Sequence, residues 1–316
     1  MAESMTALKA PFPWFGGKSR AASIIWQRFG NVRNYVEPFA GSLAVLLAAP
    51  HGGTIAETVN DLDGFVANFW RSVASDPDEV WRHADWPVSE IDLHARHIHL
   101  VNLRDELTDR LIGDPHYCDP MLAGWWAWGA SMWLGGSWCA GNGPWSSDGQ
   151  RLVAGGPPGV VRCKPKRFPT RQTHEQVRQL GARLRNVRVY AGSWERVLTP
   201  AMLGSQPTAI LLDPPYSADL GNRDMDIYAQ DSGTVAHDVR EWAMAHGTNP
   251  QLRIALCGYS GEHDELETLG WTVVPWVTQG GFAKPGTQAD ENKYRERIWF
   301  SPHCLGVATP QLFDIA

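Results

Sequence analysis

The sequence predicts an α/β protein with a doubly wound sheet and a mainly helical insert that carries a β-hairpin. Short apolar runs bounded by turn residues recur in the first quarter and in the second half of the chain, as expected of buried strands. The region between them is irregular and rich in tryptophan and glycine. The length of 316 residues suits one domain with an insert of about 100 residues.

The expected elements alternate between strand and helix on either side of this insert. Ser19 is expected to cap a helix that runs to Phe29, and Val36 closes the strand that follows. Further helices are predicted at residues 43–49, 62–75, 173–186 and 235–246. Further strands are predicted at residues 54–60, 187–190, 209–212, 253–257, 271–277 and 297–300.

The insert is expected at residues 76–170, between two parts of the sheet domain at residues 1–75 and 171–316. Its first part, residues 88–112, has a helical pattern. Further on, Asp148-Gly149 stands between Trp145 and an apolar pair at 152–153, which is typical of a β-hairpin.

The most informative segment is residues 210–216, an apolar strand-like run that ends in Asp213-Pro214-Pro215-Tyr216. Strands at the carboxyl edge of an open α/β sheet deliver side chains into the ligand crevice. The prolines remove two backbone donors, so the Asp213 carboxylate and the Pro214 carbonyl remain as acceptors. Two acceptors beside an aromatic ring suit the exocyclic amino group of a flat base, with Tyr216 stacked on it. The alternative is an ordinary strand followed by a proline turn.

Four segments in this order resemble the DNA adenine-N6 methyltransferases of the Dam type, over most of the chain. Asp213-Pro214-Pro215-Tyr216 is similar to the family's Asp-Pro-Pro-Tyr motif. The segments that precede it are Pro13-Trp14-Phe15-Gly16-Gly17-Lys18, Tyr35-Val36-Glu37-Pro38-Phe39-Ala40-Gly41-Ser42 and Asn60-Asp61-Leu62-Asp63. The resemblance implies a Rossmann-like methyltransferase sheet in which the insert is the target-recognition domain.

The resemblance also implies S-adenosylmethionine as the methyl donor. The residues that it assigns to donor binding are Trp14, Gly17, Lys18, Glu37, Pro38, Phe39, Gly41, Ser42, Asp61 and Asp213. The family's loop usually reads Gly-x-Gly, whereas Gly41 is followed here by Ser42 and Leu43. Gly41 still permits a tight turn and a close backbone approach to a ligand.

Two of these residues have alternative explanations. Asp61 lies about twenty residues after the glycine turn, an offset at which a carboxylate commonly binds a ribose hydroxyl. Asp63 is the close competitor, and either acid could instead cap the next helix. Lys18 could reach the donor's carboxylate or the target base, or be a solvated surface lysine.

The distribution of charge favours double-stranded DNA as the partner, although the net charge is −6. Residues 151–188 contain ten basic residues and the single acid Glu175, which gives one locally positive segment. The expected DNA contacts are Trp138, Trp145, Arg162, Lys164, Lys166 and Arg167. The alternatives are a solvated basic helix and tryptophans that pack in the core, which is the expectation for those at 125, 126 and 128.

Composition excludes several other classes of protein. No run of about eighteen apolar residues and no signal-like leader is present, so we expect a cytoplasmic protein without membrane contact. Five scattered cysteines form no Cys-x-x-Cys pair, which argues against zinc and disulfides. His94, His97 and His99 do not share one helix face, so we expect a surface helix and no metal. Cys257 should be a buried strand residue, and the protein a monomer.

The resulting hypothesis is a site-specific enzyme that methylates the amino nitrogen of adenine in double-stranded DNA, by base flipping and direct transfer. Asp213, Pro214, Pro215 and Tyr216 are the expected catalytic residues. The alternatives are methylation of cytosine N4, RNA or a protein amide, and a DNA-binding module without catalysis. Residues 217–231 are expected to form a flap, and residues 279–293 a loop close to DNA.

Overall fold

The computed structural model describes residues 8–14, 16–133, 138–139, 145–147, 152–154, 171–216, 234–276 and 294–306. The helices are α1 (Ala22–Phe29), α2 (Ala44–Leu47), α3 (Gly64–Ser75), α4 (Pro77–Ala84), α5 (Glu90–Gly113), α6 (Pro120–Met132), α7 (Arg171–Leu184), the 3-10 helix η1 (Trp194–Val197), α8 (Pro200–Leu203), α9 (Val235–His246) and α10 (Glu265–Thr268). The strands are β1 (Asn34–Glu37), β2 (Ala56–Asp61), β3 (Trp145–Ser147), β4 (Leu152–Ala154), β5 (Arg188–Ala191), β6 (Thr208–Leu212), β7 (Leu252–Tyr259), β8 (Thr272–Pro275) and β9 (Glu296–Phe300).

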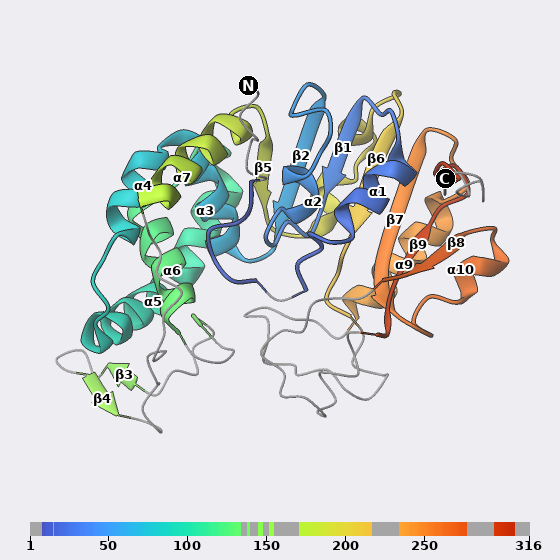
Figure 1. The fold of residues 1–316 in the computed structure, drawn as a ribbon. Helices are drawn as coiled ribbons and strands as arrows, with labels where there is room; N and C mark the ends of the chain where they lie inside the picture. Colours follow the sequence, from blue (N-terminus) through green and yellow to red (C-terminus); the bar gives the residue numbers. More distant parts are fainter. Residues whose placement is uncertain are drawn as a thin grey trace, which may run out of the picture.

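Seven of the described strands form one sheet in the order β5-β2-β1-β6-β7-β9-β8 (Figure 1). The five strands from β5 to β7 are parallel, and β9 runs antiparallel to both β7 and β8. The chain moves outward from β1 through β2 to β5, and then returns to place β6 on the other side of β1. The carboxyl ends of β1 and β6 therefore form a topological switch point, where α/β sheets bind ligands.

Both faces of the sheet are covered, because successive strand residues belong to different apolar clusters. Val36, Ile210 and Leu256 pack with η1, α8, α9 and α10. Tyr35, Leu211 and Cys257 belong to the cluster on the opposite face, with α1, α2 and α3. This alternation confirms the predicted doubly wound sheet, and it confirms Cys257 as a fully buried strand residue.

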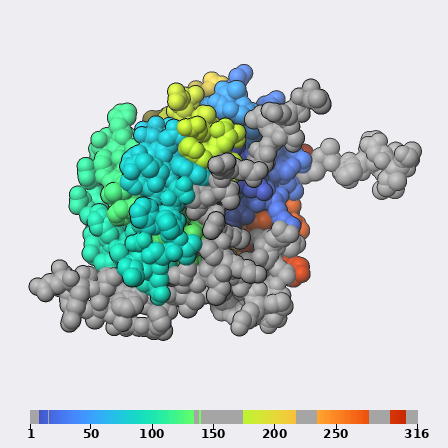
Figure 2. Space-filling view, turned by 60° about the vertical axis from the view of Figure 1, so that its left-hand side comes forward, coloured from blue at the N-terminus to red at the C-terminus, as the bar shows by residue number. Residues whose placement is uncertain are grey.

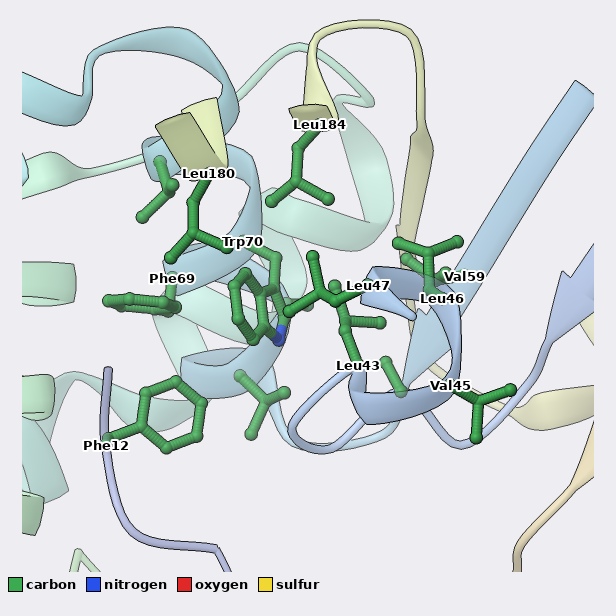
Figure 3. Close-up of a cluster of buried hydrophobic side chains, with 14 of the residues drawn as sticks. Phe12, Leu43, Val45, Leu46, Leu47, Val59, Phe69, Trp70, Leu180 and Leu184 are labelled. Carbon is green, nitrogen blue, oxygen red and sulfur yellow. The ribbon is translucent and has the colours of Figure 1, made fainter. Parts of the chain in front are cut away.

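A cluster of large apolar side chains fixes α2 against its neighbours (Figure 3). Leu43 and Leu46 are fully buried in the cluster that contains Trp70 of α3, and Leu180 and Leu184 reach the same cluster from α7. The Trp70 indole nitrogen donates a hydrogen bond of 2.9 Å to the Gly41 carbonyl oxygen. The core therefore holds the loop after β1 in place.

The helices α4, α5 and α6 form the insert and pack beside α3, at one side of the sheet (Figure 1). Figure 2 shows them, in cyan to green, as one continuous lobe. A Cβ added at Gly124 would lie 2.6 Å from the Val80 carbonyl oxygen, so α6 approaches α4 closely only because this residue is glycine. Trp126 and Trp128 are buried in this packing, as predicted.

The predicted hairpin is confirmed, since β3 and β4 pair antiparallel with Trp145 opposite Ala154. Arg71 joins the insert to the sheet. Its guanidinium donates to the Val189 carbonyl oxygen of β5 and to the carbonyl oxygens of Leu111, Asp114 and Tyr117 at the end of α5.

Two local predictions are wrong. The helix α1 begins at Ala22 with Ala21 as its N-cap, so Ser19 does not cap it. The helix α5 is a surface helix at only one of its three histidines: His99 is exposed, whereas His94 and His97 are buried, and the His97 ring stacks on Trp133 at 4.8 Å. These two imidazoles pack against aromatic residues of the insert and are therefore part of its core.

Neither a metal-binding cluster nor a membrane-spanning helix is present in the described ranges. No cluster of three or more histidine, cysteine or acidic side chains there is arranged to hold a metal ion. None of the helices in those ranges has the length and apolarity needed to cross a bilayer.

Candidate functional site

A cavity of about 290 Å³ opens at the switch point of the sheet. Its walls come from the amino-terminal segment, the ends of β1, β2, β5 and β6, and the start of α9. All ten residues that the sequence assigned to the donor line this cavity: Trp14, Gly17, Lys18, Glu37, Pro38, Phe39, Gly41, Ser42, Asp61 and Asp213. Segments far apart in the chain are thus brought to one site.

The loop of residues 38–43, here called the Gly41 loop, forms one wall of the cavity. Gly41 has φ +44°, and a Cβ there would lie 2.5 Å from the Trp14 indole nitrogen. Only glycine permits both this backbone conformation and the close approach of Trp14. Leu43 stands where the related family has its second glycine, and it too is left-handed, with φ +52°. The turn at Leu43 therefore has a backbone conformation that glycine favours, although leucine occupies it.

Asp61 and Asp63 take different roles at the end of β2. The Asp63 carboxylate accepts a hydrogen bond of 2.8 Å from the Phe65 amide and caps α3. The Asp61 carboxylate accepts from the Gly41 amide at 2.8 Å and from the Asp63 amide at 2.9 Å. Burial, together with the neighbouring charge of Asp63, raises the pKa of Asp61 to about 7. The sequence left these two acids as competitors, and the structure makes Asp63 the cap.

Glu37 adds a second buried acid at the end of β1. Its side chain accepts a hydrogen bond of 2.9 Å from the Tyr35 hydroxyl. Burial raises the pKa of Glu37 to about 8, and the negative charges of Asp213 and Asp61 add to this effect. Three acids, Glu37, Asp61 and Asp213, therefore meet in one cavity.

Lys18 pairs with the acid of the DPPY motif, residues 213–216. Its buried ammonium donates to Asp213 Oδ1 at 2.8 Å and to the Gly16 carbonyl oxygen at 2.9 Å. Burial alone would lower the pKa of Lys18, but the carboxylates of Asp213 and Glu296 outweigh it and raise the pKa. The solvated-lysine alternative is wrong, because Lys18 is only 4% exposed.

The rest of the DPPY motif surrounds this pair. Pro215 lines the cavity, and Pro214 is buried behind it. Tyr216 is half-buried, and its hydroxyl lies 3.4 Å from Asp213 Oδ1 and 2.7 Å from Glu296 Oε2. Lys18 Nζ lies 5.2 Å from the centre of the Tyr216 ring. The carboxylate, the ammonium and the ring therefore form one connected group.

Sequence reasoning missed three residues of this site. Trp194 of η1 lines the cavity and stacks on Phe39 with ring centres 6.3 Å apart. The buried Asn60 amide donates to the carbonyl oxygens of Pro38 and Gly192, and so ties two loops together. Glu296 contacts Tyr216 from β9. Trp194 and Glu296 stand in no local motif, whereas Asn60 opens the segment Asn60-Asp61-Leu62-Asp63 but was given no role there.

The expected DNA contacts fall mostly outside the described residues, including Arg162, Lys164, Lys166 and Arg167. Trp145 opens β3, and its side chain is outside the description. Trp138 is partly buried and donates its indole hydrogen to the Trp126 carbonyl oxygen at 3.0 Å. This packing favours the core alternative for Trp138.

Two arginines of the basic segment have structural partners. Arg183 is buried against Glu57 of β2, with N–O distances of 2.5 and 2.7 Å. Arg178 pairs with Asp78 at 2.6 Å on the exposed face of α7. The positive surface that the sequence predicts must therefore come mainly from other members of the segment.

The sheet order and the cavity at its switch point are consistent with a Rossmann-like methyltransferase fold, and comparison with known families supports this class. Residues 14–107 match the family of D12 class N6 adenine-specific DNA methyltransferases. The match includes the Trp14 segment, the Gly41 loop and Asp61, and it indicates an adenine-specific DNA methyltransferase. The DPPY motif lies beyond the matched residues. A search of curated proteins gave no match.

Proposed function

We propose that the protein transfers a methyl group from S-adenosylmethionine to the exocyclic amino nitrogen of adenine in double-stranded DNA. The observation that carries the proposal is the meeting of two sites in one cavity. Asp213 and Pro215 of the DPPY motif face the same space as Trp14, Gly41 and Asp61. A donor on the Gly41 loop and a base at the DPPY motif would thus lie next to each other, and such proximity lowers the barrier to transfer.

The residues of the cavity fit the proposed donor. S-adenosylmethionine supplies a methyl group on a positively charged sulfur. Glu37, Asp61 and Asp213 place three acids around the cavity, and a cationic ligand would favour their ionised forms. Asp61 would accept a hydrogen bond from a ribose hydroxyl, as acids at the end of the second strand of such sheets do. Phe39 and Trp194 offer aromatic surface for a flat ring.

The DPPY motif would hold and activate the target base. Asp213 uses Oδ1 for Lys18, and Oδ2 has no hydrogen bond from the described residues. Oδ2 and the Pro214 carbonyl oxygen would accept the two amino hydrogens of adenine, which draws the nitrogen lone pair out of the ring. As the new N–C bond forms, the electrons of the S–C bond remain on sulfur, and the surplus proton leaves nitrogen towards Asp213. The base must leave the helix to reach this position.

We also propose that residues 76–170 select the DNA sequence and that the basic residues near the end of this range bind phosphates. The insert lies beside the sheet, and the chain between β4 and α7 carries four of the expected contacts. Phosphate contacts position a protein on DNA, whereas base contacts determine the sequence that it reads.

Sequencing of modified bases in DNA from cells that express the protein tests this function. N6-methyladenine at one sequence is the expected result, and Asp213→Asn should reduce the methylation rate by about a hundredfold or more. Asparagine retains an oxygen for Lys18, so loss of folding is a smaller concern than with Asp213→Ala. Modified cytosine, or undiminished methylation by a folded Asp213→Asn protein, would contradict the proposal.

A further inference from the structure

Glu296 is a buried carboxylate that sits beside the DPPY motif but belongs to a distant strand. It opens β9 and is 6% exposed. Its Oε2 accepts the Tyr216 hydroxyl at 2.7 Å, a shorter contact than the 3.4 Å between that hydroxyl and Asp213. The stronger hydrogen bond of Tyr216 therefore leads away from the cavity acid and towards β9.

The β7-β9 pair supports the Tyr216 ring as well as its hydroxyl. Tyr259 of β7 stands opposite Glu296 in the antiparallel register. Its ring meets the Tyr216 ring edge to face, with centres 4.6 Å apart. The hydroxyl contact fixes one end of the Tyr216 ring and the Tyr259 contact limits its rotation, so the two contacts together define its plane.

A carboxylate in this position has a cost that packing alone does not justify. Burial raises the pKa of Glu296, while the Lys18 ammonium and the Tyr216 hydroxyl act in the opposite direction. An apolar residue of similar volume would fill the space without desolvating a charge. What an apolar residue cannot supply is an acceptor at a defined point for the Tyr216 hydroxyl.

We propose that Glu296 is a positioning residue that holds the Tyr216 ring in the plane on which the target base stacks. The proposal rests on the function proposed above, because it assigns the stacking role to Tyr216. Glu296 does not line the cavity, so we expect it to act mainly through the tyrosine, in addition to the effect of its charge on Lys18. Two consequences follow. Removing the Tyr216 hydroxyl should have the same effect as removing the Glu296 acceptor, and the two changes should not add.

The test is a double-mutant cycle of Tyr216→Phe and Glu296→Leu, read as single-turnover methylation and as the fluorescence of 2-aminopurine at the target position. Each single variant should lose about ten- to a hundredfold in rate, the range expected for a hydrogen bond to a charged acceptor. The methylation rate of the double variant should lie within about threefold of the rate of the slower single variant. Donor affinity should stay within about twofold, since the donor walls are untouched. The 2-aminopurine signal should change in the same way in all three variants.

Glu296→Gln provides the conservative variant, because its amide oxygen can still accept the hydroxyl, and it should recover most of the rate. Glu262→Leu is the matched control. Glu262 is another buried carboxylate near β7, and it accepts a hydrogen bond of 2.8 Å from the Tyr259 backbone amide. It should not reproduce the 2-aminopurine change.

The possible failures can be told apart. An active wild type in which Tyr216→Phe methylates normally would overturn the role of Glu296, even if Glu296→Leu does not fold. Rate losses that add in the double variant would overturn it too, because Glu296 would then act independently of Tyr216. A folded wild type that methylates no adenine would instead contradict the proposed function itself.

Discussion

Glu37 illustrates at the level of one residue how the cavity is prepared for a ligand. It lies at the end of a fully buried strand, and its hydrogen bond from Tyr35 does not offset the loss of hydration. The folded protein therefore holds a proton on Glu37 up to about pH 8, whereas the ordinary glutamate pKa is 4.5. A cationic ligand beside Glu37 would release that proton.

This difference predicts how stability depends on pH. Between pH 4.5 and about 8 the folded state binds a proton at Glu37 that the unfolded state has lost. The free energy of unfolding should therefore fall as pH rises through this window, and level off above it. Glu37→Gln should flatten the slope, measured by urea unfolding at a series of pH values.

The control is Glu267→Gln, at an exposed glutamate of α10, which should leave the slope unchanged. An identical slope in wild type and Glu37→Gln would show that Glu37 does not hold the proton.

The start of α2 shows a conflict between local backbone preference and packing. Leu43 has φ +52°, where a side chain costs about 1 to 2 kcal/mol relative to glycine. Leu43 is nonetheless fully buried in the cluster that contains Trp70, and deleting such a side chain costs about 2 to 5 kcal/mol (Figure 3). Burial outweighs strain, which explains how leucine can occupy a glycine conformation.

Two substitutions at Leu43 separate the cost of backbone strain from the stabilisation by the buried side chain. Both Leu43→Ala and Leu43→Gly should destabilise the protein, because both remove the buried side chain. Leu43→Gly should be the more stable of the two by about 1 kcal/mol, since only glycine relieves the strain. Urea unfolding of the two variants measures the difference.

Leu46 of α2 is the matched control, because it is equally buried but is not among the residues with positive φ. There the order should reverse, with Leu46→Gly less stable than Leu46→Ala by about 1 kcal/mol. If the glycine variant is less stable than the alanine variant at both positions, the backbone at Leu43 is not strained.

At the level of the whole molecule, α7 connects the insert back to the sheet. Arg183 and Glu57 form an ion pair in which the side chains are 8% and 1% exposed. Arg178 and Asp78 form a second pair between α7 and α4, with side chains 52% and 56% exposed. Because the two pairs differ in burial, we expect them to contribute differently to the free energy of unfolding, although both have good geometry.

Arg183→Met should destabilise the protein by about 3 to 5 kcal/mol, because it leaves the Glu57 carboxylate buried without its cation. Adding Glu57→Gln should recover part of that loss. Arg178→Met should cost less than about 1 kcal/mol, since its pair is solvated. Equal losses from Arg183→Met and Arg178→Met in chemical denaturation would show that the Arg183 pair is not isolated from water.

The basic segment gives a prediction for the complex with DNA. Neutralising Lys164, Lys166 and Arg167 together should reduce the salt dependence of DNA affinity by about three units of slope, one for each lost phosphate contact. Fluorescence anisotropy over a series of salt concentrations measures it. Arg33→Gln, on the exposed turn before β1, should leave the slope unchanged. A triple variant with the wild-type slope would place the DNA surface elsewhere.

The sequence by itself determined the features that depend on residues adjacent in the chain. The strand before Asp213, the turn at Gly41 and the helix Val235–His246 each follow from local patterns of apolar and turn residues, and the structure has them where they were predicted. The ten residues assigned to the donor could be predicted together because the resemblance supplied the order of four motifs along the chain, and all ten line one cavity.

Only the tertiary structure decided which of these residues touch. The pairing of β1 with β6 brings the segment of Lys18 to Asp213, and the pairing of β7 with β9 brings Glu296 to Tyr216. Burial also makes Arg183, one of the ten basic residues of the segment 151–188, the partner of Glu57 in the core. Such contacts join residues that are remote in the chain, and their energies depend on burial and strand order, which a local pattern does not contain.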